Sequence, residues 1–220
     1  APRAARARLL PLYAFNLEVA RAPWVSAEPL IAEMRLQFWR DVVVEPHRRA
    51  HEVAGPLRDL IDAGRLPAAP FLALIDARAL DREVRPFADA AALTAYLEAT
   101  GGGLMWLACA AFGPGQEAPA RDLGRAAALA TYLRAVPELA ARGRVPLPPG
   151  DPADLAREGL RWLARGRAVR LGPPALSAWQ AGPILRQAAT EPHRIEAGLL
   201  GTSAFRRRAS LIRAALIGRV

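Results

Sequence analysis

The chain has 220 residues, of which 52% are hydrophobic and 6% aromatic, and this Ala- and Leu-rich composition favours helices over sheets. All 30 basic residues are Arg and the net charge is +9, which indicates either a compositional bias or attraction to diphosphates, acidic lipid surfaces or nucleic acid. Nucleic acid is the least expected partner because the chain has no recognition motif, and the single cysteine, Cys109, excludes an internal disulfide.

Proline and glycine divide the first half of the chain into helical segments. Leu9–Arg21 is predicted to be a helix, and a second is predicted over residues 27–44, with Ser26 as its cap and Pro29 in its first turn. Apolar residues recur every fourth position of this second helix, which indicates an amphipathic helix with an apolar face of Leu30, Met34, Phe38 and Val42. Further helices are predicted over His47–Ala63, Pro70–Leu80 and Ala88–Phe112, the last with glycines at 101–103 that favour close packing or a kink.

The second half begins after a break at residues 113–115. Helices are predicted over Pro119–Val136, where Pro137 stops the helix, and from Asp151 and Pro152 to Arg165. Pro173 and Pro174 start another helix, and a last one runs over Ser203–Ile217, with Arg206, Arg207 and Arg208 near its start. Because no alternating strand pattern is present, we expect an all-α fold, an orthogonal bundle of eight to ten helices forming one domain over residues 1–220.

Several motifs resemble those of a known family. Tyr13-Ala14-Phe15, Glu28-Pro29 and the run from Arg35 to Asp41 resemble the opening helices of the squalene/phytoene synthase superfamily. Leu123-Gly124-Arg125-Ala126, Leu133-Arg134 and Arg142-Gly143-Arg144 are similar to a later part of that family's pattern. The pattern is most similar to a divergent branch that includes a mitochondrial complex I assembly factor with a phytoene-synthase-like domain. The resemblance implies a fold of the isoprenoid synthase type.

The resemblance also implies where metal-binding acids would lie. Enzymes of this family carry two acid-rich helical motifs that face each other and hold Mg²⁺ against a prenyl diphosphate. In this chain the first motif falls on Ala20, Arg21 and Trp24, and the second on Ala135 and Leu139. The acids that remain are weak remnants of metal ligation, Glu18 and Glu138. Both metal sites are therefore expected to be lost.

Other side chains are candidates for binding an anion or a lipid head group. These are Tyr13, Arg35, Arg40, Arg134 and Arg144, although each arginine could equally form a surface ion pair. His47 and His51 have the i, i+4 spacing of a helical metal site, but without a third ligand no metal is expected there.

Three functions remain open from the sequence. The first is a catalytically degenerate protein that binds an isoprenoid or other anionic lipid, or an assembly partner, at a membrane surface, with no cofactor. The second is a Mg²⁺-dependent head-to-head prenyltransferase, and the third is a structural interaction protein with a filled core. The longest apolar run, Leu104–Phe112, is too short to span a membrane, so we expect a cytoplasmic protein that is peripheral to the inner face of a membrane.

Overall fold

The computed structural model is built from helices. It describes residues 3–26, 28–47, 49–63, 66–113 and 115–217, and these ranges contain no strand. Eleven α-helices lie within them: α1 Arg3–Arg21, α2 Pro29–Val44, α3 Ala54–Asp62, α4 Ala68–Ala77, α5 Ala90–Leu97, α6 Gly103–Ala110, α7 Glu117–Ala141, α8 Pro152–Gly166, α9 Ala181–Thr190, α10 His193–Glu196 and α11 Ala204–Ile217. Four short helical segments connect some of them: η1 Ala22–Trp24, η2 Arg78–Arg82, η3 Glu98–Gly102 and η4 Pro173–Ala178. The all-α prediction is confirmed.

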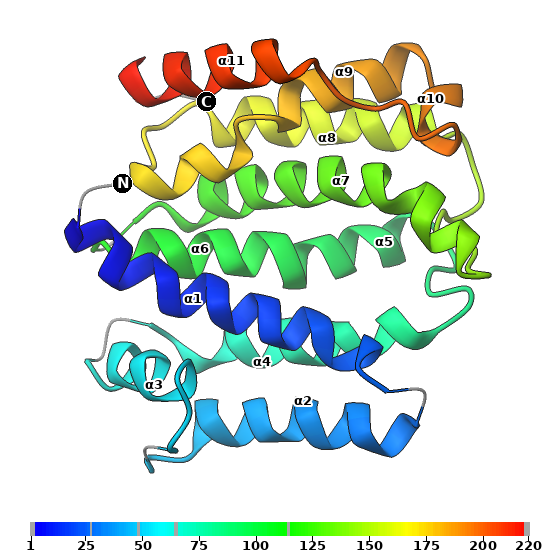
Figure 1. Ribbon diagram of the computed structural model, residues 1–220. Coiled ribbons are helices and arrows are strands. Elements are labelled where there is room, and N and C mark those ends of the chain that lie inside the picture. Colours follow the sequence, from blue (N-terminus) through cyan, green and yellow to red (C-terminus); the bar gives the residue numbers. More distant parts are fainter. Residues whose placement is uncertain (1–2, 27, 48, 64–65, 114, 218–220) are drawn as a thin grey trace.

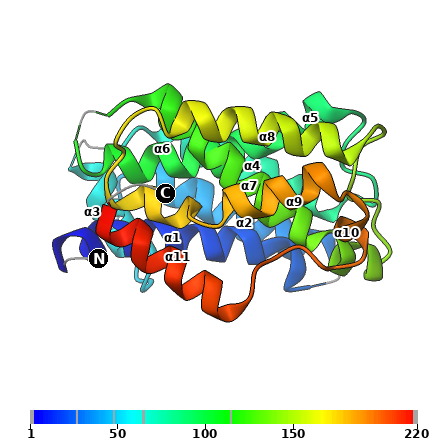
Figure 2. The same cartoon turned by 90° about the horizontal axis from the view of Figure 1, so that it is seen from above.

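The helices lie in layers on either side of α7. Figure 1 shows α2 and α4 at one edge, then α1 with α5 and α6, then α7, and finally α8, α9 and α11 at the other edge; Figure 2 gives the view from above. One group of buried apolar side chains surrounds α7, and a second joins α1, α2, α3 and α4. In this second group the ring of Phe15 packs edge-on against Trp39 and Phe71, with centroids 5.4 and 5.3 Å away. Helix α6 contributes to both groups, with Met105 and Cys109 in the first and Leu107 and Ala108 in the second, and therefore joins the two halves of the core.

The buried face of α2 agrees with the predicted one only at Val42, which is buried, and Phe38, which is half-buried. Leu30 and Met34 are 68% and 63% exposed, whereas Leu36 and Trp39 are buried. The helix carries two apolar stripes, and the stripe containing Trp39 faces the core because the large indole contacts Phe15. The predicted cap was also wrong: Glu28 occupies the capping position, and the Ser26 hydroxyl accepts a hydrogen bond from the Glu28 N–H at 3.1 Å. Residue 27, the predicted first residue of this helix, lies outside the described ranges.

The helix predicted over residues 47–63 forms only from Ala54 onwards. His51 ends the preceding loop, because its Nδ1 accepts hydrogen bonds from the N–H groups of Val53 and Ala54 at 3.1 and 3.3 Å. This side chain therefore serves a helix start instead of the metal site that its spacing with His47 would suggest.

The helix predicted over residues 88–112 is divided by a π-helical turn at η3. There the backbones of η3 and α7 approach so closely that a Cβ atom on Gly101 would lie 2.3 Å from the Cβ of Ala128. Two glycines meet at this crossing, since a Cβ on Gly124 would lie 2.2 Å from the carbonyl oxygen of Gly101. The prediction of close packing is confirmed for Gly101, whereas an added Cβ on Gly103 would have no atom nearer than 3.7 Å.

Helix α7 continues past the residue that was predicted to stop it. It runs through Pro137 to Ala141, because the ring of a proline removes a single backbone hydrogen bond and α7 keeps the others. The start of α8 is as predicted: the Asp151 side chain accepts a hydrogen bond from the N–H of Ala153 at 2.8 Å, and Pro152 is the first helical residue.

Candidate functional site

A cavity of about 490 Å³ lies between α1, the α5–η3–α6 segment and α7. Helix α7 contributes the largest share of its lining, much of it small side chains, and polar side chains of η2 and α5 also line it. Its lining includes Tyr13, Asn16, Ala20, Trp24, Arg78, Asp81, Tyr96, Thr100, Leu104, Met105, Ala127, Ala128, Thr131, Tyr132, Ala135, Leu139 and Ser177. A space of this size and lining is typical of a small-molecule site.

The positions that the family resemblance assigns to acids line this one cavity. Ala20 and Trp24 come from α1 and η1, and Ala135 and Leu139 come from α7 on another wall. Arg21, the remaining position, is exposed. Mg²⁺ takes oxygen ligands such as carboxylates, and none of these side chains supplies one. The frame of two facing motifs is therefore present without the donor atoms that a magnesium cluster requires.

Asp81 is the one carboxylate among the described residues that line the cavity, and it is already engaged. Its two oxygens lie 3.3 Å from Nη1 of Arg78 and 2.7 Å from the donating hydroxyl of Tyr96. The same Arg78 nitrogen donates to the Tyr96 hydroxyl at 2.8 Å. No group of three or more His, Cys, Asp or Glu side chains in the described ranges could hold a metal ion. The residues present do not fit a magnesium site.

Positive charge lies beside Trp24 at the edge of the cavity. The guanidinium groups of Arg142 and Arg144 stack on the Trp24 ring, at 5.1 and 5.2 Å from its centroid. Arg144 also donates hydrogen bonds to the carbonyl oxygens of Leu80, at 3.1 Å, and Asp81. It therefore ties the loop after α7 to η2. Trp24 occupies an expected metal-ligand position and carries two cations in place of a carboxylate.

The tyrosines of the cavity are neutral hydrogen-bonding groups at physiological pH. Burial raises the pKa of Tyr96 and of Tyr132 well above the ordinary value of a phenol. Burial also raises the pKa of Tyr13, against the opposing effect of its hydrogen bond with Ser177. The Tyr132 hydroxyl donates to the carbonyl oxygen of Pro146 at 2.8 Å. These side chains can orient a polar group, but they are poor proton acceptors.

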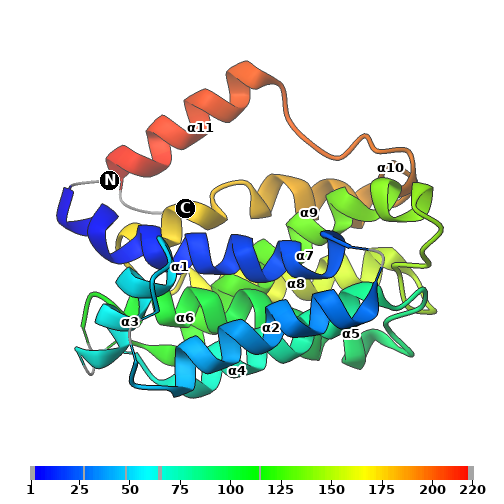
Figure 3. The ribbon, with the colours of Figure 1, turned by 60° about the horizontal axis from the view of Figure 1, so that its bottom comes forward.

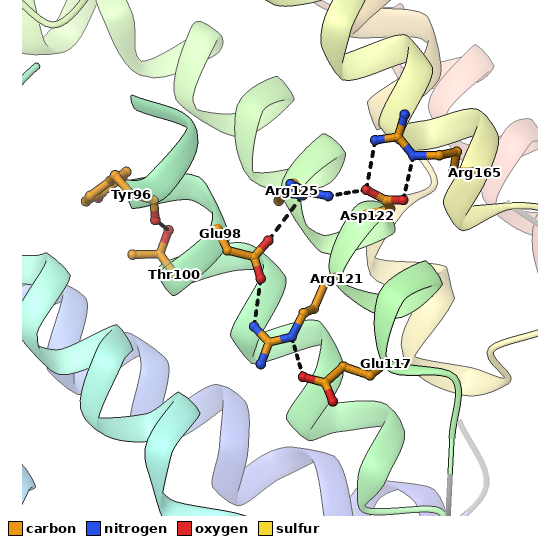
Figure 4. Close-up of polar contacts among 8 residues, drawn as sticks. All are labelled: Tyr96, Glu98, Thr100, Glu117, Arg121, Asp122, Arg125 and Arg165. Carbon is orange, nitrogen blue, oxygen red and sulfur yellow. Dashed lines mark hydrogen bonds and ion pairs between the residues drawn. The ribbon is translucent and has the colours of Figure 1, made fainter. Parts of the chain in front are cut away.

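An ionic network joins η3, which lines the cavity, to α7 and α8. Figure 4 shows Glu98 of the π-helical turn between two arginines of α7, with oxygens 2.7 Å from Arg121 and 3.1 Å from Arg125. Asp122 of α7 bonds Arg165 of α8 at 2.8 Å and also pairs with Arg125. Burial opposes ionisation of Asp122, but the hydrogen bonds from Arg165 and Arg125 outweigh it and lower the pKa of this carboxyl. The network therefore holds η3, α7 and α8 in fixed positions.

The structure does not bring the predicted anion-binding residues together. Tyr13 lines the cavity, but Arg35 is exposed on α2, where it lines a separate hollow with Glu18. Arg40 is paired with carboxylates of Glu33 and Asp76, at 2.8 and 2.9 Å. The bundle distributes the predicted arginines over different faces, so they do not line one common pocket.

The remaining candidates also lie apart from one another. Arg134 lines a third hollow beside α9 and α11, and Glu138 is exposed and pairs with Arg142 at 2.5 Å. Arg78 and Asp81, the charged residues of the cavity, were not among the candidates. Their i, i+3 spacing is the signal that could have indicated a pair.

None of the helices in the described part of the chain is long and apolar enough to cross a membrane. Helix α11 has three consecutive arginines, Arg206, Arg207 and Arg208, near its start, and mostly apolar residues follow them in its sequence.

Comparison with known proteins identifies the relatives of the chain. A protein-family model described as squalene/phytoene synthase matches residues 1–173. The NADH dehydrogenase (ubiquinone) complex I assembly factor 6 of Rattus norvegicus is 30% identical over 146 residues, which are 62% of this chain and 43% of the relative. Its Homo sapiens counterpart is 28% identical over 156 residues, 67% of this chain and 46% of the relative. The match thus spans less than half the length of these curated relatives.

Solved structures share the fold. A dehydrosqualene synthase in complex with a ligand superimposes with a TM-score of 0.77 at 16% identity, over 98% of this chain and 88% of that chain. A squalene synthase from Alicyclobacillus acidocaldarius gives a TM-score of 0.69 at 21% identity, over 96% and 86%. At these identities the likeness establishes the fold alone, whereas the family model covers well over half of the sequence. The chain belongs to the squalene/phytoene synthase family.

Proposed function

We propose that this protein binds an isoprenoid lipid in the central cavity and does not carry out magnesium-dependent prenyl transfer. One observation carries the proposal. The facing positions expected to hold metal-binding acids are Ala20, Trp24, Ala135 and Leu139, and they line an apolar cavity whose one described carboxylate is engaged by Arg78 and Tyr96. The space for an isoprenoid chain is kept, while the means of binding the metal is absent.

The lining supports binding of a chain with a polar or anionic head. An apolar chain in the cavity gains the free energy of leaving water, about 25 cal/mol per Å² of buried apolar surface. Arg142, beside Trp24, can turn from its exposed pairing with Glu138 towards a negatively charged group. A guanidinium supplies a fixed positive charge and paired donors to a phosphate without any metal.

Prenyl transfer would need more than this cavity offers. A departing diphosphate develops charge that bound Mg²⁺ neutralises in enzymes of this chemistry. Each ion needs oxygen ligands from the protein, and Asp81 would have to leave its pairing with Arg78 to provide even one. Binding without turnover therefore agrees better with the donor set.

Calorimetric titration with farnesyl diphosphate and geranylgeranyl diphosphate tests the proposal, in Mg²⁺ and in a chelator. We expect equal affinity in both. Replacing Ala135, which lines the cavity, with Phe should weaken binding about tenfold or more, since the added ring takes the space of the ligand. The control is Ala140→Phe, at an exposed position of the same helix, and it should bind like the original protein.

Two results would contradict the proposal. Binding that requires Mg²⁺, with release of diphosphate and formation of a joined product, would establish the prenyltransferase. Absence of binding by either diphosphate, and by farnesol, would exclude the cavity as an isoprenoid site.

We also propose, as a second function, a role in assembling a respiratory complex through α2. The relatives named as complex I assembly factors support it, and so do the exposed apolar side chains of Leu30, Ile31 and Met34 on the outer face of α2. In cells lacking the gene, the amount of assembled complex I should fall and the unaltered gene should restore it. The double variant Leu30→Glu, Met34→Glu should fail to restore complex I. The control Leu10→Glu, at an equally exposed site on α1, should restore it. Normal complex I in the deleted cells would refute this role.

A further inference from the structure

A second hollow, of about 400 Å³, lies between α7, α9 and α11, away from the central cavity. Three arginines line it: Arg134 from α7 and the pair Arg206 and Arg207 from the first turns of α11. Its other lining residues are Trp179, Gln180, Pro183, Ile184, Leu200, Gly201, Thr202 and Ser210. No described residue of the lining is acidic, and none is shared with the central cavity. The hollow thus combines concentrated positive charge with an apolar floor.

The guanidinium groups of these three arginines are not engaged within the described part of the chain. Many other arginines are: Arg40, Arg121 and Arg165, for example, each pair with a carboxylate at 2.9 Å or less. No hydrogen bond or ion pair joins the side chains of Arg134, Arg206 or Arg207 to another described residue. Like charges gathered in one place repel each other, and a bound anion would relieve that repulsion. The charge of this hollow is therefore available to a ligand.

The position of α11 adds an apolar component. Figure 3 shows α11 crossing the outside of the bundle, joined to it by the segment that follows α10. Phe205 and Ile212 on this helix are 81% and 60% exposed. A helix that presents both arginines and apolar side chains at a surface is suited to bind an amphiphile. The arginines can contact its charged group, and the apolar side chains can contact its hydrocarbon chain.

We propose that the hollow between α7, α9 and α11 binds a phosphate group, carried by an anionic phospholipid or by a soluble phosphorylated compound. The planar guanidinium presents parallel N–H donors that match phosphate oxygens, so three of them can surround one phosphate. Trp179 and Ile184 on the floor contact the adjoining apolar part of the ligand. This site is independent of the isoprenoid proposal, because its residues lie outside the central cavity.

Arg134 makes the proposal testable. A basic amphipathic helix could attach to an acidic membrane through α11 alone, and such attachment would not need an arginine on α7. A built phosphate site needs both helices. Removing Arg134 should therefore weaken binding as strongly as removing one arginine of α11.

The experiment measures two kinds of binding with the same variants. Flotation with vesicles of phosphatidylcholine, with and without phosphatidylglycerol, tests the lipid source, and calorimetric titration with inorganic pyrophosphate tests the soluble source. Loss of one charge-assisted hydrogen-bond partner should weaken binding by about tenfold or more. We expect this loss in Arg134→Gln and a larger one in the double variant Arg206→Gln, Arg207→Gln. The control is Arg157→Gln, Arg161→Gln, which removes two exposed charges from α8.

Each outcome has one meaning. Arginine-dependent binding to the acidic vesicles alone identifies a phospholipid site, and arginine-dependent binding of pyrophosphate identifies a site for soluble phosphates. Three results would overturn the proposal: absence of binding in both assays, an equal loss in the α8 control, or vesicle binding retained by Arg134→Gln, which would leave α11 as a simple basic helix. Circular dichroism of each variant confirms that the bundle is intact.

Discussion

Replacing Gly124 with Ala should destabilise the protein, although alanine is the better helix former. The new Cβ atom would lie 2.2 Å from the carbonyl oxygen of Gly101 and 2.6 Å from the Cβ of Met105. Ordinary contacts lie near 3.5 Å, so α7 and η3 would have to separate by roughly 1 Å. Overpacking costs about 1–3 kcal/mol, at the upper end here because one obstacle is backbone, and helix propensity returns about 1 kcal/mol. The expected net loss is about 2 kcal/mol.

Urea and thermal unfolding followed by circular dichroism measure this loss. In a chain of this size, about 2 kcal/mol corresponds to a fall in Tm of roughly 4–8 °C. The control is Gly103→Ala in α6, where the nearest atoms to an added Cβ are 3.7 Å away. That variant should be neutral or more stable by about 0.5–1 kcal/mol. Equal stability of the Gly124→Ala and Gly103→Ala variants would refute the packing argument.

Two further predictions concern ionisable groups. Asp122→Asn should lower the free energy of unfolding at pH 7 by about 2 kcal/mol, because the buried side chain loses its charge-assisted bonds. Since the folded-state pKa of Asp122 is lowered, its stabilisation is present above the unfolded pKa of about 3.9 and is lost as pH falls through the folded value. Urea unfolding at pH 7 and pH 3 should therefore show a difference from the original protein that shrinks in acid; a constant difference would contradict this. Burial raises the pKa of the Cys109 thiol to about 11, so a thiol reagent at pH 8 should react slowly until urea unfolds the chain. Rapid reaction of the folded protein would show that the thiol is accessible.

The helical fold could be predicted because the local signals in the sequence, such as helix caps and glycine positions, all indicate helices. Asp151 and Pro152 begin α8 as their capping preferences require, and Gly101 lies where η3 and α7 cross. The buried face of α2 could not be chosen in this way. The spacing of Leu30 and Met34 fits a helical repeat, and so does the spacing of Leu36 and Trp39. Only the tertiary contact of Trp39 with Phe15 decides which of the two faces is buried.

The sequence predicted which two segments line the candidate site, but it did not predict the side-chain contacts within the site. The resemblance placed Ala20 and Ala135 at corresponding positions of two motifs, and the structure places both on one cavity. The hydrogen bond from the Tyr96 hydroxyl to Asp81, by contrast, depends on η2 folding back towards α5, because the two residues are fifteen positions apart. The hollow beside α11 likewise joins Arg134 to Arg206 across most of the second half of the chain. Spacing along a sequence does not predict contacts between residues that lie this far apart in it.

The π-helical turn at Glu98–Gly102 makes this part of the chain intolerant of length changes. A π turn holds one residue more than an α turn, so a single deletion there would restore a continuous α-helix from α5 into α6. Because the wide turn absorbs its extra residue, α5 and α6 would keep nearly their present orientation. The residues of the turn itself would shift, however, and with them the Gly101 backbone that meets Gly124 and the Glu98 carboxylate that lies between two arginines. Insertions and deletions should therefore accumulate in the loops of this lineage and be absent from these five residues.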